Sequence, residues 1–154
     1  MLSIGRSSTR HTPAVAGGWA SLLREEETYV AANSFGAGIL LIHYAGELLR
    51  HVDDDARNLA QSAVERIIDQ HLGWTDRTAM VTSGRIGVVM VPVEGPLALS
   101  RRAREIHRGL RSTGIDADVA YSVRRPSGGL QAAAARADGA LDTALVRRTR
   151  PNTS

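Results

Sequence analysis

The sequence contains no cysteine and no lysine, and these two absences narrow the chemistry that the protein could perform. Without cysteine there can be no disulfide, no thiolate nucleophile and no cysteine-ligated zinc or iron–sulfur centre, so a metal would need carboxylates or histidines. All 19 basic residues are Arg, which also excludes a lysine amine as a nucleophile or Schiff-base former.

Long apolar runs are also missing. No stretch approaches the roughly 18 apolar residues of a membrane span, and residues 1–12 lack the apolar segment of a secretory signal. We therefore expect no membrane span and a cytoplasmic location. The formal net charge of +3 is modest, so net charge alone does not indicate nucleic acid as a partner.

The length of 154 residues fits one domain with loose ends. Residues 1–18 are rich in Ser, Thr, Arg, Gly and Pro and show no sustained period, which predicts a flexible N-terminal arm. Residues 19–148 are predicted to form the domain, and residues 149–154 a C-terminal tail.

The spacing of apolar residues predicts helices at about 19–33, 59–72, 99–110 and 130–145, and strands at 38–44, 79–82, 86–91 and 116–123. The strand at 38–44 is apolar almost throughout, as expected for a central strand covered on both faces. Ser83-Gly84-Arg85 between two β-rich runs indicates a hairpin, and Glu25, Glu26 and Glu27 are expected to face solvent. This order predicts an α/β (α+β) fold, in which helices flank a mixed, mostly antiparallel sheet with a ferredoxin-like core.

Three segments, in the same order, resemble the GGDEF (diguanylate cyclase) family over roughly residues 19–152. The run His43-Tyr44-Ala45-Gly46-Glu47-Leu48 stands where the family has Asp-x-Asp-x-Phe-Lys after its first strand. Ser83-Gly84-Arg85-Ile86-Gly87, followed by an apolar strand and Pro92, stands where the family has Gly-Gly-Asp-Glu-Phe. The run from Arg136 to Leu145 is similar to the family's C-terminal helix. The resemblance implies the palm fold of nucleotidyl cyclases.

The same resemblance implies that the cyclase chemistry is lost. The family joins two GTP molecules with the help of two Mg²⁺ ions, which prefer carboxylate oxygens. The former metal-ligand positions hold His43 and Arg85, and Ile86 replaces the active-site glutamate. An arginine cannot ligate a cation, and its charge repels one. We therefore expect no catalytic residues, no metal and no cofactor.

Other features of the family's site are also replaced. His51 and Arg57 lie near the positions that read guanine in the family, and Leu48 and Leu145 lie near its phosphate-contacting lysines. The product-inhibition motif, Arg-x-x-Asp, would fall on Trp74 and Arg77 and is absent.

These substitutions favour a regulatory or protein-interaction module in bacterial nucleotide second-messenger signalling, binding a protein partner or a second copy through a hairpin that presents Ser83, Gly84 and Arg85. A first alternative is a non-catalytic sensor that binds GTP or a cyclic dinucleotide in the old cleft, with Arg85 on a phosphate. A weaker alternative is a divergent nucleotidyl cyclase using His43 and an aspartate of 53–55.

Three remaining features have simpler interpretations beside the functional ones. Asp53-Asp54-Asp55 could bind a cation with His43 and His51, but a helix N-cap is favoured. Arg101, Arg104 and Arg108 form a basic helix face that is either solvated or a contact for phosphates, an acidic protein or an anionic membrane, while DNA is not an expected partner. Gly128-Gly129 could hold a phosphate before a helix, but a turn is favoured.

Overall fold

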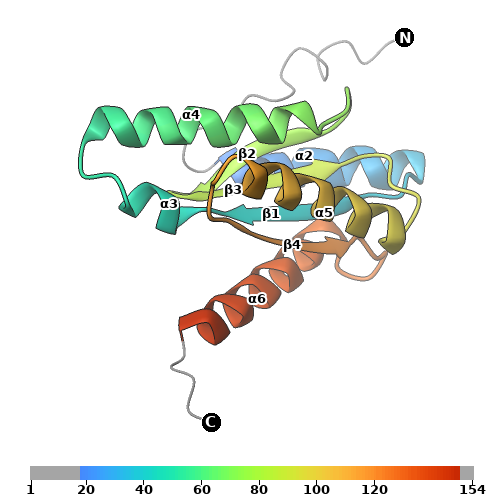
Figure 1. The fold of residues 1–154 in the computed structure, drawn as a ribbon. Helices are drawn as coiled ribbons and strands as arrows, with labels where there is room; N and C mark the ends of the chain where they lie inside the picture. The colour runs from blue at the N-terminus through green and yellow to red at the C-terminus, as the bar shows by residue number, and fades with distance from the viewer. Residues whose placement is uncertain (1–17, 150–154) are drawn as a thin grey trace.

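The computed structural model describes residues 18–149, in which helices lie on both faces of one four-stranded sheet (Figure 1). The predicted arm and tail lie outside the described residues, except for Gly18 and Thr149, which begin α2 and end α6. In chain order the elements are α2 Gly18–Asn33, β1 Gly38–His43, α3 Ala45–Leu49, α4 Asp54–Gln70, β2 Arg77–Thr82, β3 Arg85–Met90, α5 Pro96–Ser112, β4 Asp118–Val123 and α6 Gly129–Thr149.

The strands are ordered β2-β3-β1-β4, and each neighbouring pair is antiparallel. This is the strand order of a ferredoxin-like core, so the predicted fold class is confirmed, with an antiparallel sheet in place of a mixed one. β1 lies in the interior of the sheet and is buried on both faces, because its uninterrupted apolar run can pack in both directions.

Two hydrophobic cores lie on opposite faces of the sheet. α2 and α6 cover one face, where Leu23 and Leu141 pack near Ile39 of β1. α4 and α5 cover the other face, where Ile68 and Ile106 pack near Leu40. The predicted apolar face of α5 is confirmed in full, since its four members are all buried: Leu99, Ala103, Ile106 and Leu110.

Three details of the sequence-based prediction were wrong. The polar segment after β1 contains a short helix, α3, because tertiary contacts of Glu47 order it. Leu59 was expected in the core face of α4 but is 73% exposed, since it lies beyond the edge of the packed stripe. Glu26 was expected in solvent but is 1% exposed, and its carboxylate pairs with Arg77 of β2 at 3.2 Å.

The predicted helix cap at the start of α4 is confirmed. The Asp53 carboxylate accepts a hydrogen bond from the Asp55 amide at 3.2 Å, while Asp54 and Asp55 occupy the first turn, where the helix dipole favours acids. Within residues 18–149, no helix has the length and hydropathy that crossing a bilayer requires.

Candidate functional site

The end of β1 and the β2–β3 hairpin lie side by side, as the resemblance requires. His43 faces Arg85 in the β1–β3 register, and the Tyr44 amide donates to the Gly84 carbonyl at 2.7 Å. Gly84 has a φ of +81°, and a Cβ there would lie 2.6 Å from the Ala45 Cα. The surviving glycine of the signature is therefore required both by its left-handed backbone and by this close approach.

Arg85 is held by groups of its own chain. Its Nε donates to His43 Nδ1 at 3.2 Å, Nη1 donates to Asp138 Oδ1 at 2.7 Å, and Nη2 donates to Asp142 Oδ1 at 3.2 Å. The side chain is only 12% exposed. Its guanidinium therefore joins the hairpin to α6, at the position where the resemblance implies a metal ligand.

The rest of the hairpin signature offers little to a partner. Of the turn residues, Ser83 is exposed, but Gly84 is buried against Ala45. Ile86 is 1% exposed and belongs to the core beneath α4 and α5. Gly87 leaves room for the Trp19 ring, whose Cη2 lies 2.5 Å from where a Cβ would be. The expectation that the turn presents Ser83, Gly84 and Arg85 is thus met by Ser83 alone.

The surroundings of the His43 ring favour its neutral form. Burial lowers the pKa of His43 from its ordinary value of 6.5, and the Arg85 cation lowers it further, against a smaller opposite effect of Asp118 and Asp142. Accepting a hydrogen bond at Nδ1 places the remaining ring proton on Nε2.

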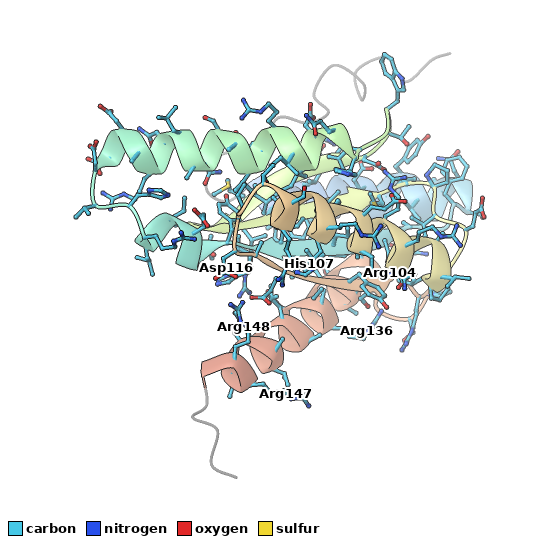
Figure 2. The ribbon with its side chains drawn as sticks, in the orientation of Figure 1. Arg104, His107, Asp116, Arg136, Arg147 and Arg148 are labelled. Atoms are coloured by element: carbon cyan, nitrogen blue, oxygen red, sulfur yellow. The ribbon has the colours of Figure 1, made fainter. Side chains whose placement is uncertain are left out.

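A hollow of about 340 Å³ lies beside His43, between the start of α3 and the end of α6. Arg148 crosses it from α6, donating to Asp116 Oδ1 at 3.1 Å and also to Asp118 at the start of β4 (Figure 2). Ala45, Gly46, Leu49 and Leu145 line the rest of this hollow, so its wall is more apolar than polar.

The residues at this site do not fit a magnesium ion. Mg²⁺ requires several hard oxygen ligands, but His43 offers a nitrogen that already accepts from Arg85. The nearby carboxylates of Asp138 and Asp142 are already paired with the same guanidinium. Among residues 18–149, no three acidic or histidine side chains converge on one point, including Asp53 to Asp55 with His43 and His51.

Glu47 ties together the segment after β1, where the resemblance implies that guanine is read. This carboxylate is 7% exposed and accepts from Arg50 at 3.1 Å and from the Asp116 amide at 3.1 Å, with His51 Nε2 at 3.4 Å. Arg57 donates to the His51 carbonyl at 3.1 Å and pairs with Asp54. Both residues that lie near the family's guanine-reading positions therefore make contacts within the chain.

A second hollow, of about 540 Å³, lies between α3 and α4. Its wall is largely apolar, with Ala60, Ala63 and Ile67 of α4, and Arg66 and His51 lie at its polar parts. Three large apolar side chains are exposed near this corner of the molecule: Leu49 at 82%, Val52 at 95% and Leu59 at 73%. We call Leu49, Val52 and Leu59, at and between α3 and α4, the apolar corner.

The N-terminus of α6 is occupied by a carboxylate of the chain itself. Glu27 Oε1 accepts from the Leu130 amide at 2.8 Å, and the same carboxylate takes two hydrogen bonds from Arg124, at 2.8 and 2.6 Å. Gly128 and Gly129, with φ of +89° and +61°, form the turn that was favoured from the sequence. The Glu27 carboxylate therefore takes the place at this helix end where a phosphate was considered from Gly128-Gly129.

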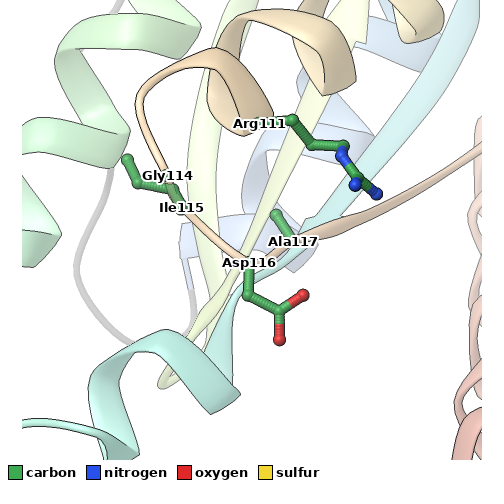
Figure 3. Close-up of a pocket in the computed structure, with 5 residues that line it drawn as sticks. All are labelled: Arg111, Gly114, Ile115, Asp116 and Ala117. Carbon is green, nitrogen blue, oxygen red and sulfur yellow. The ribbon is translucent and has the colours of Figure 1, made fainter.

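The three arginines predicted as contacts on α5, Arg101, Arg104 and Arg108, are exposed. A hollow of about 510 Å³ on this helix is lined by Arg104, His107, Arg108, Arg111 and Ser112. It adjoins a smaller one, of about 230 Å³, where Arg111 lies opposite the segment from Gly114 to Ala117 (Figure 3). The basic face therefore continues toward the start of β4.

Trp74 and Arg77 occupy the positions on which the product-inhibition motif would fall. Trp74 is 70% exposed, and Arg77 pairs with Glu25 at 3.0 Å and with Glu26 at 3.2 Å.

Asp138 and Asp142 are site residues that sequence reasoning did not single out. Their spacing of four residues places both carboxylates on one face of a helix, which is the signal that could have found them. Their common partner could not be found in this way, because Arg85 is 53 residues from Asp138 along the chain.

Comparison with solved structures places this geometry in a known fold. The GGDEF domain of YfiN (TpbB) from Pseudomonas aeruginosa aligns with a TM-score of 0.67 and 20% identity, over 90% of this chain and 86% of that one. DgcB from Caulobacter crescentus, in complex with c-di-GMP, aligns with a TM-score of 0.72 and 14% identity, over 96% of this chain and 85% of that one. The diguanylate cyclase SiaD from Pseudomonas aeruginosa, in complex with its activator SiaC, aligns with a TM-score of 0.72 and 16% identity. The alignment covers 97% of this chain and 62% of that one.

No protein-family model matches the sequence, and neither does any curated protein. At these identities the structural similarity establishes the fold, so the chain is an α+β domain with the GGDEF-domain fold. The predicted resemblance to GGDEF domains is thereby confirmed at the level of the fold.

Proposed function

We propose that this GGDEF-fold domain is catalytically inactive and acts as a regulatory protein-interaction module. The observation that carries the proposal is Arg85, which stands at a former metal-ligand position and is held by His43, Asp138 and Asp142. A fixed positive charge there opposes both metal binding and the approach of a metal–triphosphate complex to its usual position. The neighbouring Ile86 is buried in the core and has no lone pair for a ligand role.

The interaction role is supported by the apolar corner formed by Leu49, Val52 and Leu59. Large apolar side chains grouped on a surface are costly in water and are typical of protein interaction sites. All three are more than 70% exposed, and Leu59 lines the larger hollow while Leu49 lines the smaller one beside His43. SiaD, which shares this fold, is in complex with an activator protein. A protein partner, or a second copy of this chain, would cover the apolar corner.

Incubation with GTP tests the catalytic half of the proposal. The purified protein with Mg²⁺ or Mn²⁺ should form no cyclic di-GMP detectable by liquid chromatography and mass spectrometry, while an active diguanylate cyclase assayed in parallel does. Product formation above the no-enzyme background would refute the proposal and support the divergent cyclase instead.

The interaction half is tested by changing the apolar corner. Partners captured from the native host by the wild-type protein should be lost with the double variant Val52→Asp/Leu59→Asp. Leu97→Asp is the matched control, because Leu97 is 67% exposed on α5, away from the corner. If the corner variant keeps every partner that the control keeps, this surface does not carry the interaction.

A nucleotide sensor is the second candidate, and the hollow of about 540 Å³ between α3 and α4 supports it. A volume of this size is within the range of small-molecule sites, and it lies where the resemblance implies that guanine is read. Calorimetry with GTP, ATP and cyclic di-GMP separates the candidates. Micromolar binding that Ala60→Phe abolishes supports the sensor, and additional loss in Arg85→Ala supports the predicted phosphate contact. Flat titrations support the interaction module.

A further inference from the structure

The two edges of the sheet differ in how well a further strand could pair with them. β2 forms one edge, and its register is interrupted by a shift between Met80 and Thr82. β4 forms the other edge and keeps an unbroken register with β1 from Asp118 to Val123. Within residues 18–149, no strand pairs with the outer side of β4. Proteins usually disrupt a free edge with a bulge, a proline or a lysine, and β4 has none of these.

The alternation of the ladder identifies which backbone groups of β4 point outward. The Arg124 amide donates inward to the Ala37 carbonyl at 2.9 Å, so residues 124, 122, 120 and 118 form the hydrogen-bonded pairs with β1. The amides and carbonyls of Val119, Tyr121 and Val123 therefore point away from the sheet. Arg136 already donates to one of them, the Val123 carbonyl, at 2.8 Å. The groups of Val119 and Tyr121 remain for another strand.

Arginines lie on both sides of this edge. On α5, Arg102 and Gly109 lie against His71 at the end of α4, so the opposite flank, with Arg104, His107 and Arg111, is turned toward β4. On α6, Arg136 and Arg148 contact the two ends of β4. Figure 2 labels Arg104 and His107 of α5 and Arg136 and Arg148 of α6, which lie on either side of β4.

From this arrangement we propose that β4 is a docking edge for an acidic, extended segment of a protein partner. The segment adds a fifth strand through the outward groups of Val119 and Tyr121, and its carboxylates meet Arg104 and Arg111 on one side and Arg136 on the other. This names a partner class for the interaction module proposed above and rests on that proposal. It uses a surface separate from the apolar corner.

A second copy of this chain fits the same edge less well. Antiparallel pairing of two β4 strands about Tyr121 keeps the same face of both sheets on one side, so it would bring the α5 arginines of the two copies toward each other, and likewise the α6 arginines. Like charges at that distance oppose association. An acidic strand meets the same side chains with the opposite charge.

The test uses a labelled peptide of repeating Glu-Glu-Val-Val, because neighbouring residues of an extended strand point to opposite faces and its carboxylates can then reach both α5 and α6. Three comparison peptides accompany it. Replacing Glu by Gln removes the charge, replacing Glu by Lys reverses it, and N-methylation of alternate amides removes the main-chain donors without altering charge. We expect the Glu peptide to bind, with amide shifts at Val119 and Tyr121 in ¹⁵N NMR spectra. The Gln and N-methylated peptides should each bind at least tenfold more weakly, and the Lys peptide should not bind.

Charge reversal on the protein supplies the matched control. Arg104→Glu/Arg111→Glu should raise the Kd for the Glu peptide at least tenfold. Arg66→Glu/Arg101→Glu makes the same change in net charge at exposed positions away from β4 and should alter the Kd less than twofold. Circular dichroism checks that both variants are folded.

Equal binding of the N-methylated peptide, no binding of the Glu peptide at millimolar concentration, or equal effects of the two double variants would overturn the inference. So would concentration-dependent shifts at Val119 and Tyr121 of the protein alone, because these would indicate self-pairing. The GTP assay is read separately. If the protein converts GTP and still binds the Glu peptide, only the proposal of an inactive module is refuted. If it neither converts GTP nor binds the Glu peptide, only the docking edge is refuted.

Discussion

At the scale of single residues, Arg85 joins the hairpin to α6. An acid at this position would be surrounded by His43, Asp138 and Asp142 and would repel the two carboxylates. An arginine donates a hydrogen bond to each of these three groups. Because its side chain is only 12% exposed, water competes little for these hydrogen bonds. Arg85 therefore acts as an internal tie between the hairpin and α6.

Replacing Arg85 by Ala should lower the free energy of unfolding by about 1–3 kcal/mol, because it leaves Asp138 and Asp142 without their cation. Urea denaturation followed by circular dichroism measures the change. Arg101→Ala, at an exposed position of α5, is the control and should change it by less than about 0.5 kcal/mol. Equal effects of the two variants would contradict the tie.

His43 should make the protein sensitive to mild acid. Its pKa is lowered in the folded state by burial and by Arg85, with Asp118, Asp142 and Arg148 as the other charges nearby. The unfolded chain therefore binds the proton more readily than the folded one. The free energy of unfolding should consequently fall as the pH drops below about 6.5. His43→Gln keeps an acceptor but cannot titrate. The stability difference between pH 7.5 and 5.5 should be smaller in the variant than in the wild type, and an unchanged difference would exclude His43 as the cause.

At the scale of elements, Glu27 fastens three of them together. From α2 it accepts two hydrogen bonds from Arg124, just after β4, and one from the first turn of α6 at Leu130. The Arg124 hydrogen bonds lower the pKa of Glu27, so it stays ionised where the α6 dipole favours an anion. This carboxylate does for α6 what a side-chain N-cap does in other helices, from a distant part of the chain.

Glu27→Gln should therefore reduce the free energy of unfolding at pH 7 by about 1–2 kcal/mol, since the amide loses the charge that Arg124 and the helix end both favour. Glu25→Gln, on the same helix with a side chain that is 61% exposed, should have little effect. Because the folded pKa of Glu27 is lowered, the difference between wild type and Glu27→Gln should shrink as pH falls below its ordinary 4.5. Thermal melts of the three proteins at pH 7 and pH 4 check both points.

At the scale of the whole molecule, two different surfaces lie in separate places around the sheet and its two cores. The apolar corner of Leu49, Val52 and Leu59 lies by α3 and α4, while the basic edge lies along β4 between α5 and α6 (Figure 1). The two surfaces do not share residues, so each can be altered without the other. A regulatory module with two separable contacts would follow from this arrangement.

Limited digestion with trypsin tests the predicted domain limits. The enzyme cleaves after arginine, and the predicted arm carries Arg6 and Arg10. We expect the first cuts at these two sites, leaving a fragment that resists further digestion, because arginines such as Arg85 and Arg124 are paired within the fold. Intact-mass measurements over time identify the cuts. Early cleavage after Arg85 or Arg124 would contradict the domain limits.

The sequence by itself determined much of this protein. Hydrophobic spacing located the helices and strands, because periods of 3.6 and 2 follow directly from the backbone geometry. The resemblance to GGDEF domains, which is confirmed for the fold, could also be recognised from three local runs of residues.

Only the tertiary structure decided which groups satisfy one another. Arg85 meets Asp138 across 53 residues, Glu27 meets Leu130 across 103, and Glu47 orders α3 through Asp116 across 69. The free edge of β4 likewise depends on strand order rather than on the strand's own residues. Local periodicity carries no information about such distant pairings, because they arise from the packing of complete elements against one another.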